Sequence, residues 1–468
     1  MRVKCVFGLA KTPVARDRGS DKPQPRGGCH PLPRSIFTRK QRYRYTGVFL
    51  GSCLSFWAIA PAQAQPWLTP SVAPEPQLTA QATGVCPAQL PAQIGAIANR
   101  PGLQRSRWGI LVQRLDTGET LFAQEAQRFF IPASNTKLLT TAAVLERLGA
   151  NFQIRTSVYQ VPSQTGMIAR VVGRGDPSLT EVQLQQLAQQ LRQRGITRLD
   201  RLIVDDHYFK GELINSTWEW SDTQTDYGAP ANSLILNQNA VGERAVANPT
   251  QYFLQRFQRI LNTTQITVAG TAIAPTPSVT PEPELAAVLS QPLSTLLIET
   301  NQNSNNLYAE ALLRSLGTVT NPNEDSLASG IAAIETTLSR LGVDPQSIDL
   351  ADGSGLSRHN QVTPEALVQT LRGMARSPNA TVFRNSLAIA GVRGTLQNRF
   401  RDTPVQDRLQ GKTGALSGVA ALSGYLDPPN YPPLAFSILL NHFDQPVRTV
   451  RPAIDEIVLL LGRLRQCE

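Results

Sequence analysis

The stretch from Phe129 to Ala150, FFIPASNTKLLTTAAVLERLGA, most constrains the fold, because it joins a helix to two residues of potential reactivity at its start. Ser134 and Lys137 are three residues apart, so on an α-helix their side chains share one face and lie within hydrogen-bond reach. A serine hydroxyl needs a base to act as a nucleophile, and a lysine is a base only where its pKa is lowered. The alternative is that Ser134 merely caps the helix, as serine often does.

Two further motifs follow in the chain. The first precedes a helical stretch and the second begins a pair of strands: Ser304-Asn305-Asn306 and Lys412-Thr413-Gly414. Taken singly, the first motif could be a helix cap and the second a surface turn. Taken together and in this order after Ser-x-x-Lys, the three motifs are typical of penicillin-recognising serine enzymes.

The segments around these motifs alternate between strand and helix patterns. Two strands joined by a turn at Asp116-Thr117-Gly118 lead into the helix that follows Ser134. Downstream, TPEALVQTLRGMAR predicts a helix with Thr363 as its N-cap and Pro364 in its first turn. GVAALSGYL and PLAFSILLNHF predict strands, and residues 450–466 predict a closing helix. The pattern indicates an α+β fold, with a sheet covered by helices.

Composition shifts divide the chain. A Pro-, Ala- and Gln-rich stretch precedes the first strands, short strands and turns dominate from Thr156, and a Pro-dense connector runs from Ala274 to Leu285. We therefore predict a basic leader with a signal peptide at 1–64 and a linker at 65–95. The main domain is predicted in two parts, at 96–155 with Ser-x-x-Lys and at 291–468 with the other two motifs. An inserted β-rich domain is predicted between them, at 156–290.

The formal charge of +10 is concentrated at one end of the chain. Residues 1–44 hold 12 Lys and Arg against two Asp, and the rest of the chain balances 33 basic with 33 acidic residues. The basic pI therefore indicates no nucleic-acid partner. Four histidines without ligand spacing and few thiols likewise indicate no metal site, and no motif indicates a cofactor.

An apolar run at 47–60 ends in Ala62-Gln63-Ala64, a small-x-small pattern that predicts signal-peptidase cleavage after Ala64 and export to the periplasm. The alternatives are an uncleaved anchor and a lipoprotein site at Cys53. Export leaves two cysteines in the mature chain, Cys86 and Cys467, near its two ends. In an oxidising compartment they either pair, as we predict, or stay as free thiols.

Over residues 95–465 the chain resembles the D-alanyl-D-alanine carboxypeptidase/endopeptidase family, the class C low-molecular-mass penicillin-binding proteins. Beyond the three motifs, four segments carry the resemblance: GRGDPSLT at 173–180, WEWSDTQTDYGAPANSLILNQN at 218–239, DGSGLSRHN at 352–360 and GVRGTLQNRF at 391–400. The 170 residues between Ser134 and Ser304 match the domain that this family inserts there. The resemblance implies a penicillin-recognising serine transpeptidase/β-lactamase-like domain, with an antiparallel sheet covered by helices.

The resemblance also implies roles for the motif residues. Ser134 is expected to be the acylated nucleophile, Lys137 its base and Ser304 a proton relay to the leaving D-alanine. The remaining motif residues are expected to bind the substrate. Asn306 is expected to bind its amide, Lys412 and Thr413 its terminal carboxylate, and Gly414 is expected to let the substrate strand approach the sheet edge. The backbone N–H groups of Ser134 and Ala415 are expected to form the oxyanion hole. Asn305 stands where relatives often have Asp, and it has no direct chemical role.

A pocket for the third residue of the stem peptide is implied by relatives that cleave diaminopimelate-type peptides. The matching positions are Asp222, Tyr227 and Arg358. The acid and the arginine are expected to select a side chain that carries both an ammonium and a carboxylate, because a side chain without these charges would leave both protein groups unpaired. A surface salt bridge is the alternative. Some relatives carry a longer amide at the position of Ser417, so one contact is expected to be missing.

The expected function is that of a penicillin-sensitive serine D-Ala-D-Ala carboxypeptidase, DD-endopeptidase, or both, acting on peptidoglycan stem peptides through an acyl-enzyme, with β-lactams as covalent inhibitors. Two alternatives stay open: a β-lactamase, which differs in fast deacylation, and a non-catalytic wall-binding protein of the same fold. The sequence does not separate carboxypeptidase from endopeptidase action, and it predicts no oligomeric state.

Overall fold

The computed structural model describes residues 84–278 and 281–467. The predicted leader, the signal peptide and most of the predicted linker lie outside these residues. Within them, none of the helices has the length and apolar character needed to cross a membrane. The description below follows one compact unit, which contains all of these residues.

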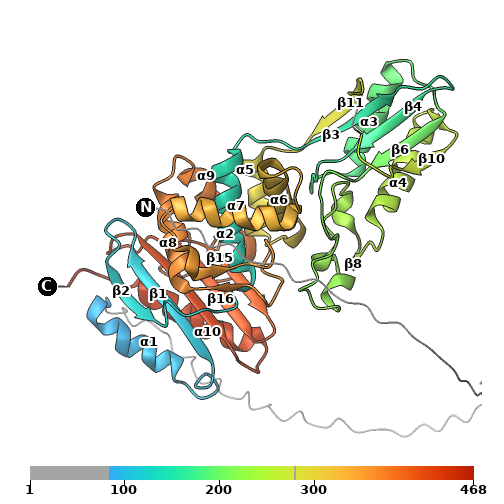
Figure 1. Ribbon diagram of the computed structural model, residues 1–468. Coiled ribbons are helices and arrows are strands. Elements are labelled where there is room, and N and C mark those ends of the chain that lie inside the picture. Colours follow the sequence, from blue (N-terminus) through green and yellow to red (C-terminus); the bar gives the residue numbers. More distant parts are fainter. Residues whose placement is uncertain (1–83, 279–280, 468) are drawn as a thin grey trace, which may run out of the picture. The chain divides into compact units, whose positions relative to one another are not determined.

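The main domain is built on a six-stranded antiparallel sheet (Figure 1), and the third motif lies in one of its strands, Leu409–Leu416. Its order is β14-β15-β16-β17-β1-β2, with the strands spanning Ala388–Ile389, Leu409–Leu416, Val419–Leu426, Leu434–Asn441, Arg107–Arg114 and Thr120–Gln124. Every residue of β16 and β17 is buried. A sheet buried in this way must be covered on both faces.

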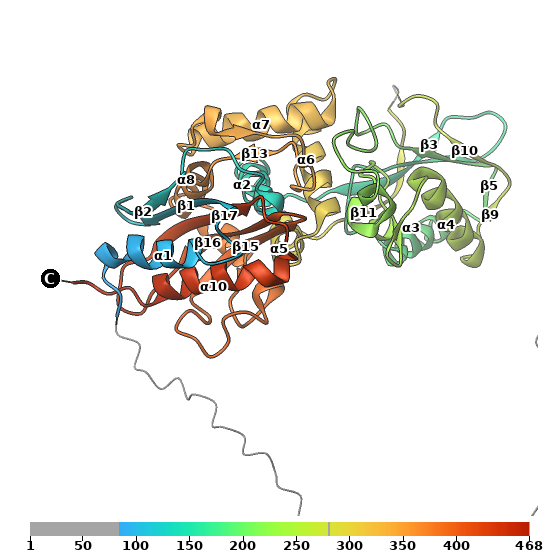
Figure 2. The same cartoon turned by 90° about the horizontal axis from the view of Figure 1, so that it is seen from below.

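Helices cover both faces (Figure 2). One face carries α2, α5, α6, α7, α8 and α9, which span Thr136–Leu148, Leu293–Gln302, Asn306–Thr320, Ser326–Arg340, Pro364–Ala375 and Ala380–Asn385. The other face carries α1 (Leu90–Ala98) and α10 (Val447–Gly462), which pack on each other. The expected arrangement of a sheet between helices is thus present.

Two boundaries differ from the sequence analysis. Helix α1 begins at Leu90, inside the range assigned to the linker, and buries Leu90, Ile94 and Ile97. Its nine residues are too short, and too rich in Ala and Gln, to be separated from a linker by composition. The closing helix spans Val447–Gly462 instead of 450–466. The α8 prediction is confirmed, since the Thr363 side chain accepts a hydrogen bond from the Ala366 N–H at 3.0 Å.

The block inserted after α2 has its own mixed sheet and core. The sheet order is β10-β6-β4-β3-β11, with the strands spanning Thr271–Ile273, Arg201–Asp205, Ile168–Val172, Arg155–Val161 and Glu284–Leu289. Two long helices, α3 (Glu181–Gln193) and α4 (Pro249–Thr263), pack on it. The insert is therefore α/β rather than β-rich. Its sheet runs from Arg155 of β3 to Leu289 of β11, and the bounds of 156–290 for the insert stay a prediction.

Short elements complete the chain. Strand β5 (Arg198–Leu199) pairs with β9 (Thr267–Val268), β7 (Ala240–Val241) pairs with β8 (Arg244–Ala245), and β12 (Ile348–Asp349) pairs with β13 (Gln361–Val362). The 3₁₀ turns η1 to η7 are Pro87–Gln89, Ala133–Asn135, Asp222–Gln224, Asp226–Gly228, Asn237–Asn239, Pro345–Ser347 and Gly394–Leu396.

A disulfide joins Cys86 to Cys467, with the Cα atoms 5.7 Å apart. It links residues 381 positions apart in the sequence. Beside it, Val85 forms an isolated parallel bridge with Leu464. The beginning and the end of the described chain are therefore tied together.

Candidate active site

Ser134 lies in the 3₁₀ turn η2, directly before α2, and not at the helix cap. The N-cap of α2 is Asn135, whose side chain donates instead to the Ser423 hydroxyl of β16 at 2.7 Å. Ala133, which directly precedes Ser134, has a φ of 46°, a conformation that costs free energy for any residue with a Cβ. The turn is thus held against the sheet by buried contacts, and the capping interpretation of Ser134 is wrong.

Lys137 is fully buried and faces three oxygen atoms. Its Nζ lies 3.0 Å from Ser134 Oγ, 2.7 Å from Asn306 Oδ1 and 2.6 Å from the Ser354 carbonyl oxygen. The first two motifs therefore meet at this amine. The third contact comes from the DGSGLSRHN segment.

The amine of Lys137 is suited to act as a base. Burial lowers its pKa from 10.5 to about 7, although the carboxylates of Asp352 and Glu310 oppose the shift. A neutral amine has two N–H groups and one lone pair. Because the two carbonyl oxygens accept the two N–H groups, the lone pair is left to face the Ser134 hydroxyl.

Two buried carboxylates hold the segment that contacts Lys137. Asp352 accepts from the Gly355 and Ser357 N–H groups at 2.7 and 2.6 Å. Glu310, on α6, accepts from the Gly353 and Ser354 N–H groups at 3.0 and 2.8 Å. Both carboxylates thereby orient the peptide whose carbonyl binds Lys137.

Glu310 was missed by the sequence analysis, although a signal was present. It is the single acidic residue in the apolar stretch NLYAEALLRSLG, four residues after Asn306 and hence on the same helix face. Burial and the nearby Asp352 raise its pKa to about 7. A shift of this kind marks an electrostatically coupled group beside a reactive centre.

Ser304 and Lys412 form the second contact between motifs. Ser304 lies between α5 and α6 with a φ of 60°, and its hydroxyl accepts from Lys412 Nζ at 2.8 Å. Lys412 is fully buried, and burial, together with the neighbouring Lys137, lowers its pKa well below 10.5. Lys-Thr-Gly is thus part of a buried strand, β15, and not a surface turn. Asn305, and not Ser304, caps α6 by accepting from the Tyr308 N–H.

The remaining residues of the third motif lie along an open edge of the sheet. Strand β14 pairs with β15 only at Gln410 and Gly411, which leaves residues 412–416 without a partner strand on that side in the described part of the chain. The Thr413 hydroxyl hydrogen-bonds to the Thr395 hydroxyl at 2.9 Å. A Cβ at Gly414 would lie 2.8 Å from the Pro132 carbonyl oxygen, so the glycine allows the turn that carries Ser134 to approach the strand.

A cavity of about 340 Å³ brings these groups together. Its lining includes the proposed reactive residues and the sheet edge, together with residues from the 391–400 segment and α10: Ser134, Ser304, Thr395, Arg399, Thr413, Gly414, Ala415, Ala420, Ala421, Val447, Arg451 and Ile454. All three motifs contribute to the site, because Ser134, Ser304 and Thr413 line the cavity and Lys137 contacts both Ser134 and Asn306.

The expected third-residue pocket is only partly assembled as predicted. The Tyr227 hydroxyl donates to Asp222 at 3.3 Å, and burial raises the pKa of that carboxyl. Arg358, however, is paired with Glu219 at 2.6 Å, and it donates to the Ser417 carbonyl at 3.0 Å. Glu219 lies in the WEWSD segment but was not singled out, since sequence alone could not choose between three nearby acids.

The loop that carries this pocket is anchored to Asn306 and Asp352. The Asn306 side chain donates to the Tyr227 carbonyl at 3.0 Å, and the Trp218 indole donates to Asp352 at 2.9 Å. The segment after β6 of the insert therefore contacts both the second motif and the carboxylate that supports Lys137.

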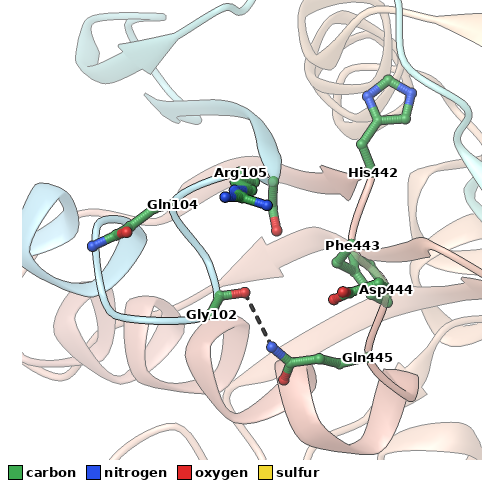
Figure 3. Close-up of a pocket in the computed structure, with 8 residues that line it drawn as sticks. Gly102, Gln104, Arg105, His442, Phe443, Asp444 and Gln445 are labelled. Atoms are coloured by element: carbon green, nitrogen blue, oxygen red, sulfur yellow. Dashed lines mark hydrogen bonds between the residues drawn. The ribbon is translucent and has the colours of Figure 1, made fainter.

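A different cavity, of about 610 Å³, lies where β1 begins and β17 ends (Figure 3). In it, Gln445 donates to the Gly102 carbonyl at 3.1 Å, and Arg105 and His442 also line the cavity. None of the three motifs contributes to its lining. This cavity is therefore not the candidate active site, although it is larger than the cavity at Ser134.

Comparison with known proteins gives a single answer. The pattern of the D-Ala-D-Ala carboxypeptidase 3 (S13) family matches residues 90–245 and 242–460. The D-alanyl-D-alanine carboxypeptidase of Actinomadura sp. is 30% identical over 451 residues, covering 78% of this chain and 84% of that protein. Carboxypeptidase DacB of Mycolicibacterium smegmatis is 29% identical, covering 86% and 88%.

Solved structures support the same fold. Penicillin-binding protein 4 (dacB) from Haemophilus influenzae has a TM-score of 0.73 at 22% identity, covering 79% of this chain and 99% of that one. A predatory endopeptidase from Bdellovibrio bacteriovorus has a TM-score of 0.54 at 18% identity, covering 77% and 92%. With its three motifs assembled around Ser134, the chain belongs to the D-Ala-D-Ala carboxypeptidase 3 (S13) family and is a serine-type D-Ala-D-Ala carboxypeptidase.

Proposed function

We propose that this carboxypeptidase acts on peptidoglycan stem peptides through an acyl-enzyme at Ser134, with Lys137 as the general base. One observation carries the assignment: Lys137 Nζ lies between two carbonyl acceptors and 3.0 Å from Ser134 Oγ. With a pKa of about 7, the amine is substantially neutral at physiological pH. It therefore has a lone pair directed at the hydroxyl.

In the proposed reaction, the lone pair of Lys137 takes the proton of Ser134 while Oγ bonds to the carbonyl carbon between the two D-alanines. The carbonyl electron pair moves to the oxygen, which accepts hydrogen bonds from the N–H groups of Ser134 and Ala415. The C–N bond then breaks as the carbonyl re-forms, and Ser304 gives its proton to the leaving amine and regains the proton that Lys137 took. Water hydrolyses the resulting ester and frees Ser134.

Substrate binding is proposed at the edge of β15. The terminal carboxylate lies against Lys412 and Thr413, where it restores the charge that burial disfavours on the Lys412 amine. The peptide extends along the unpaired edge at 412–416, and Asn306 binds its amide. A β-lactam enters the same site, and ring opening leaves its acyl group on Ser134.

The third residue of the stem peptide is proposed to contact Asp222, Tyr227 and Arg358. We add Glu219 to this group, since it already holds the Arg358 guanidinium. Two carboxylates and one guanidinium favour a side chain that carries both an ammonium and a carboxylate. This part of the proposal rests on charge alone.

We also propose that the protein is exported to the periplasm and cleaved after Ala64. The apolar run at 47–60 and the small residues at Ala62 and Ala64 support export. The disulfide between Cys86 and Cys467 supports it independently, because such bonds persist in oxidising compartments.

Fluorescent penicillin tests the nucleophile. We expect the protein to be labelled covalently, and we expect Ser134→Ala to abolish labelling. Ser339→Ala, at an exposed serine of α7, is the matched control and should be labelled like the parent. A folded parent that stays unlabelled, or a labelled Ser134→Ala, would end the proposal. Rapid nitrocefin turnover would favour the β-lactamase alternative.

A further inference from the structure

The middle residue of the second motif has three polar contacts and no role in the reaction derived so far. Asn305 caps α6, because its Oδ1 accepts from the Tyr308 N–H at 3.2 Å. Its Nδ2 donates to Gln238 Oε1 at 2.7 Å and to Glu299 Oε1 at 3.3 Å. The oxygen and the nitrogen of this side-chain amide are thus both in use.

The two acceptors come from different parts of the chain. Glu299 lies on α5, and its Oε2 accepts from the Asn303 side chain at 2.6 Å. Gln238 lies in η5 of the insert, where three successive residues have φ values of 49°, 56° and 49°. The middle value belongs to Gln238, for which this region costs more than for its two asparagine neighbours.

Buried contacts anchor the segment that carries Gln238. The fully buried Asn239 donates from its side chain to the Pro230 carbonyl at 2.8 Å. Ile235 of the same segment belongs to a small buried cluster with Leu307 of α6. Gln238 is therefore presented at the start of α6 by a segment that is fastened to that helix.

Asn305 lies between the two reactive members of its motif. Ser304, on one side, accepts from Lys412 Nζ at 2.8 Å. Asn306, on the other side, accepts from Lys137 Nζ at 2.7 Å. A rotation of the backbone at 305 moves both neighbours, so the contacts of the Asn305 side chain act on both reactive side chains.

An aspartate at position 305 would keep the cap and lose the donor. Its carboxylate would still accept from the Tyr308 N–H. The Gln238 amide would be able to turn over and donate to it. The Glu299 carboxylate only accepts, so two carboxylates would face each other there.

We propose that Glu299 and Gln238 are positioning residues, which hold Asn305 by its amide. Through Asn305 they set Ser304 and Asn306 in place for the reaction. This inference rests on the proposed function, in which these two neighbours take part in proton transfer and substrate binding. It also explains why an amide suits position 305, since a carboxylate there would face Glu299.

A double-mutant cycle tests the contact with Glu299. We expect Asn305→Asp to slow acylation by penicillin about 3- to 10-fold, as for the loss of one hydrogen bond. Glu299→Gln keeps an acceptor oxygen and should change the rate less than about twofold. With both substitutions, the new amide at 299 donates to the new carboxylate at 305, so the rate should return to within about twofold of the parent.

Asn303→Asp separates position from charge. It adds the same charge beside Glu299, on an exposed side chain, and its acylation rate should match the parent. The loss in Asn305→Asp should persist above about pH 8, where the Lys137 amine is neutral. An effect of charge alone would raise the pKa of Lys137 and vanish at high pH.

The contact with Gln238 has its own test. Gln238→Met removes the acceptor at nearly constant length, and we expect acylation to slow about threefold. Gln255→Met, at an exposed glutamine of α4, should match the parent. Thermal unfolding checks that each variant is folded, and the exposed Gln238 remains testable if Asn305→Asp does not fold.

The outcomes separate the positioning role from the proposed function. Equal losses in Asn305→Asp and Asn303→Asp, no recovery in the double variant, or an unchanged rate in Gln238→Met would overturn the positioning role. The proposed function would stand in each of these cases, because the parent is still acylated. A parent that penicillin does not acylate would instead overturn the proposed function.

Discussion

At the scale of single residues, the buried amine of Lys137 decides what the site can do. An ammonium at this position would donate all three of its hydrogens, one of them to Ser134. The neutral form donates two, to Asn306 and Ser354, and presents its lone pair to the hydroxyl. Burial favours the neutral form, whereas Asp352 and Glu310 favour the charged one. The pKa of about 7 is the balance of these effects.

The pKa of Lys137 predicts the pH dependence of acylation. Its value is lowered from 10.5 to about 7, so the reactive neutral amine is lost as the pH falls below about 7. We expect the second-order rate constant for acylation by penicillin to fall about tenfold per pH unit below about pH 6 and to be level above about pH 8. Stopped-flow acylation across this range measures it. A rate that still rises towards pH 10 would contradict a depressed pKa.

Residue identity could be predicted for the reactive groups but not for the residues that hold them. Ser134, Lys137, Asn306 and Lys412 belong to short motifs with fixed spacing, and the structure brings them together. Glu310 and Glu219 are single acids in otherwise ordinary segments. Their contacts, with Ser354 and Arg358, are made to residues far away in the chain. Such contacts depend on the tertiary fold, which spacing does not encode.

At the scale of elements, the site is built where helices and strands end. Ser134 precedes α2, Ser304 precedes α6, and residues 352–358 form a loop after β12. Helices and strands with clear periodicity could be predicted, and the structure confirms Thr363 as the N-cap of α8. The conformation of the junctions could not. Ala133 and Ser304 both have a positive φ, which runs against the preference of these residues, and Ala133 is fully buried there.

The contact between two of these junctions gives a prediction for Gly355. Its φ is 80°, and an added Cβ would lie 1.9 Å from the Ala133 carbonyl oxygen, on the turn that carries Ser134. Gly355→Ala must push this turn and the loop apart. We expect acylation by penicillin to slow about 10- to 100-fold, since a shift of about 1 Å at a reactive group has this cost.

Gly342→Ala is the matched control for this prediction. Gly342 also has a positive φ, of 89°, but nothing lies within 4 Å of its added Cβ. Both variants carry the left-handed strain of about 1–2 kcal/mol in the free energy of unfolding. Only Gly355→Ala should change the acylation rate. Equal acylation rates in the two variants would show that the loop and the turn move independently.

At the scale of the whole molecule, the chain packs a core on each face of the main sheet and another in the insert, and a segment of the insert reaches the site. The insert has its own sheet and hydrophobic core, yet its 206–248 segment supplies Trp218 and Tyr227 to the contacts around Asp352 and Asn306. Composition indicated an inserted block at 156–290, and these bounds stay a prediction. It did not predict α3 and α4 as a covering layer, because turn-rich segments between the helices dominated the pattern.

The disulfide ties the described chain at its two ends, which gives the last prediction. Cys86 precedes α1, Cys467 follows α10, and these helices pack together beneath the main sheet. Without the bond, these ends are still held by the Val85–Leu464 and Asn430–Arg465 bridges, by the Arg100–Glu456 ion pair and by the packing of α1 on α10. Since closing a loop this long restricts the unfolded chain strongly, we expect Cys86→Ser to lower the free energy of unfolding by about 2–4 kcal/mol.

Thermal unfolding of the mature protein measures this loss, with Cys467→Ser and the double variant as controls. All three variants remove the same bond, so their Tm values should fall together, by about 2–5 °C. Reduction of the parent should reproduce the fall, and reduction of the double variant should change nothing. Acylation by penicillin below the transition should match the parent in every case, because the bond contacts none of the motif residues. If reduction left the Tm of the parent unchanged, the packing of α1 on α10 would by itself hold the ends of the chain.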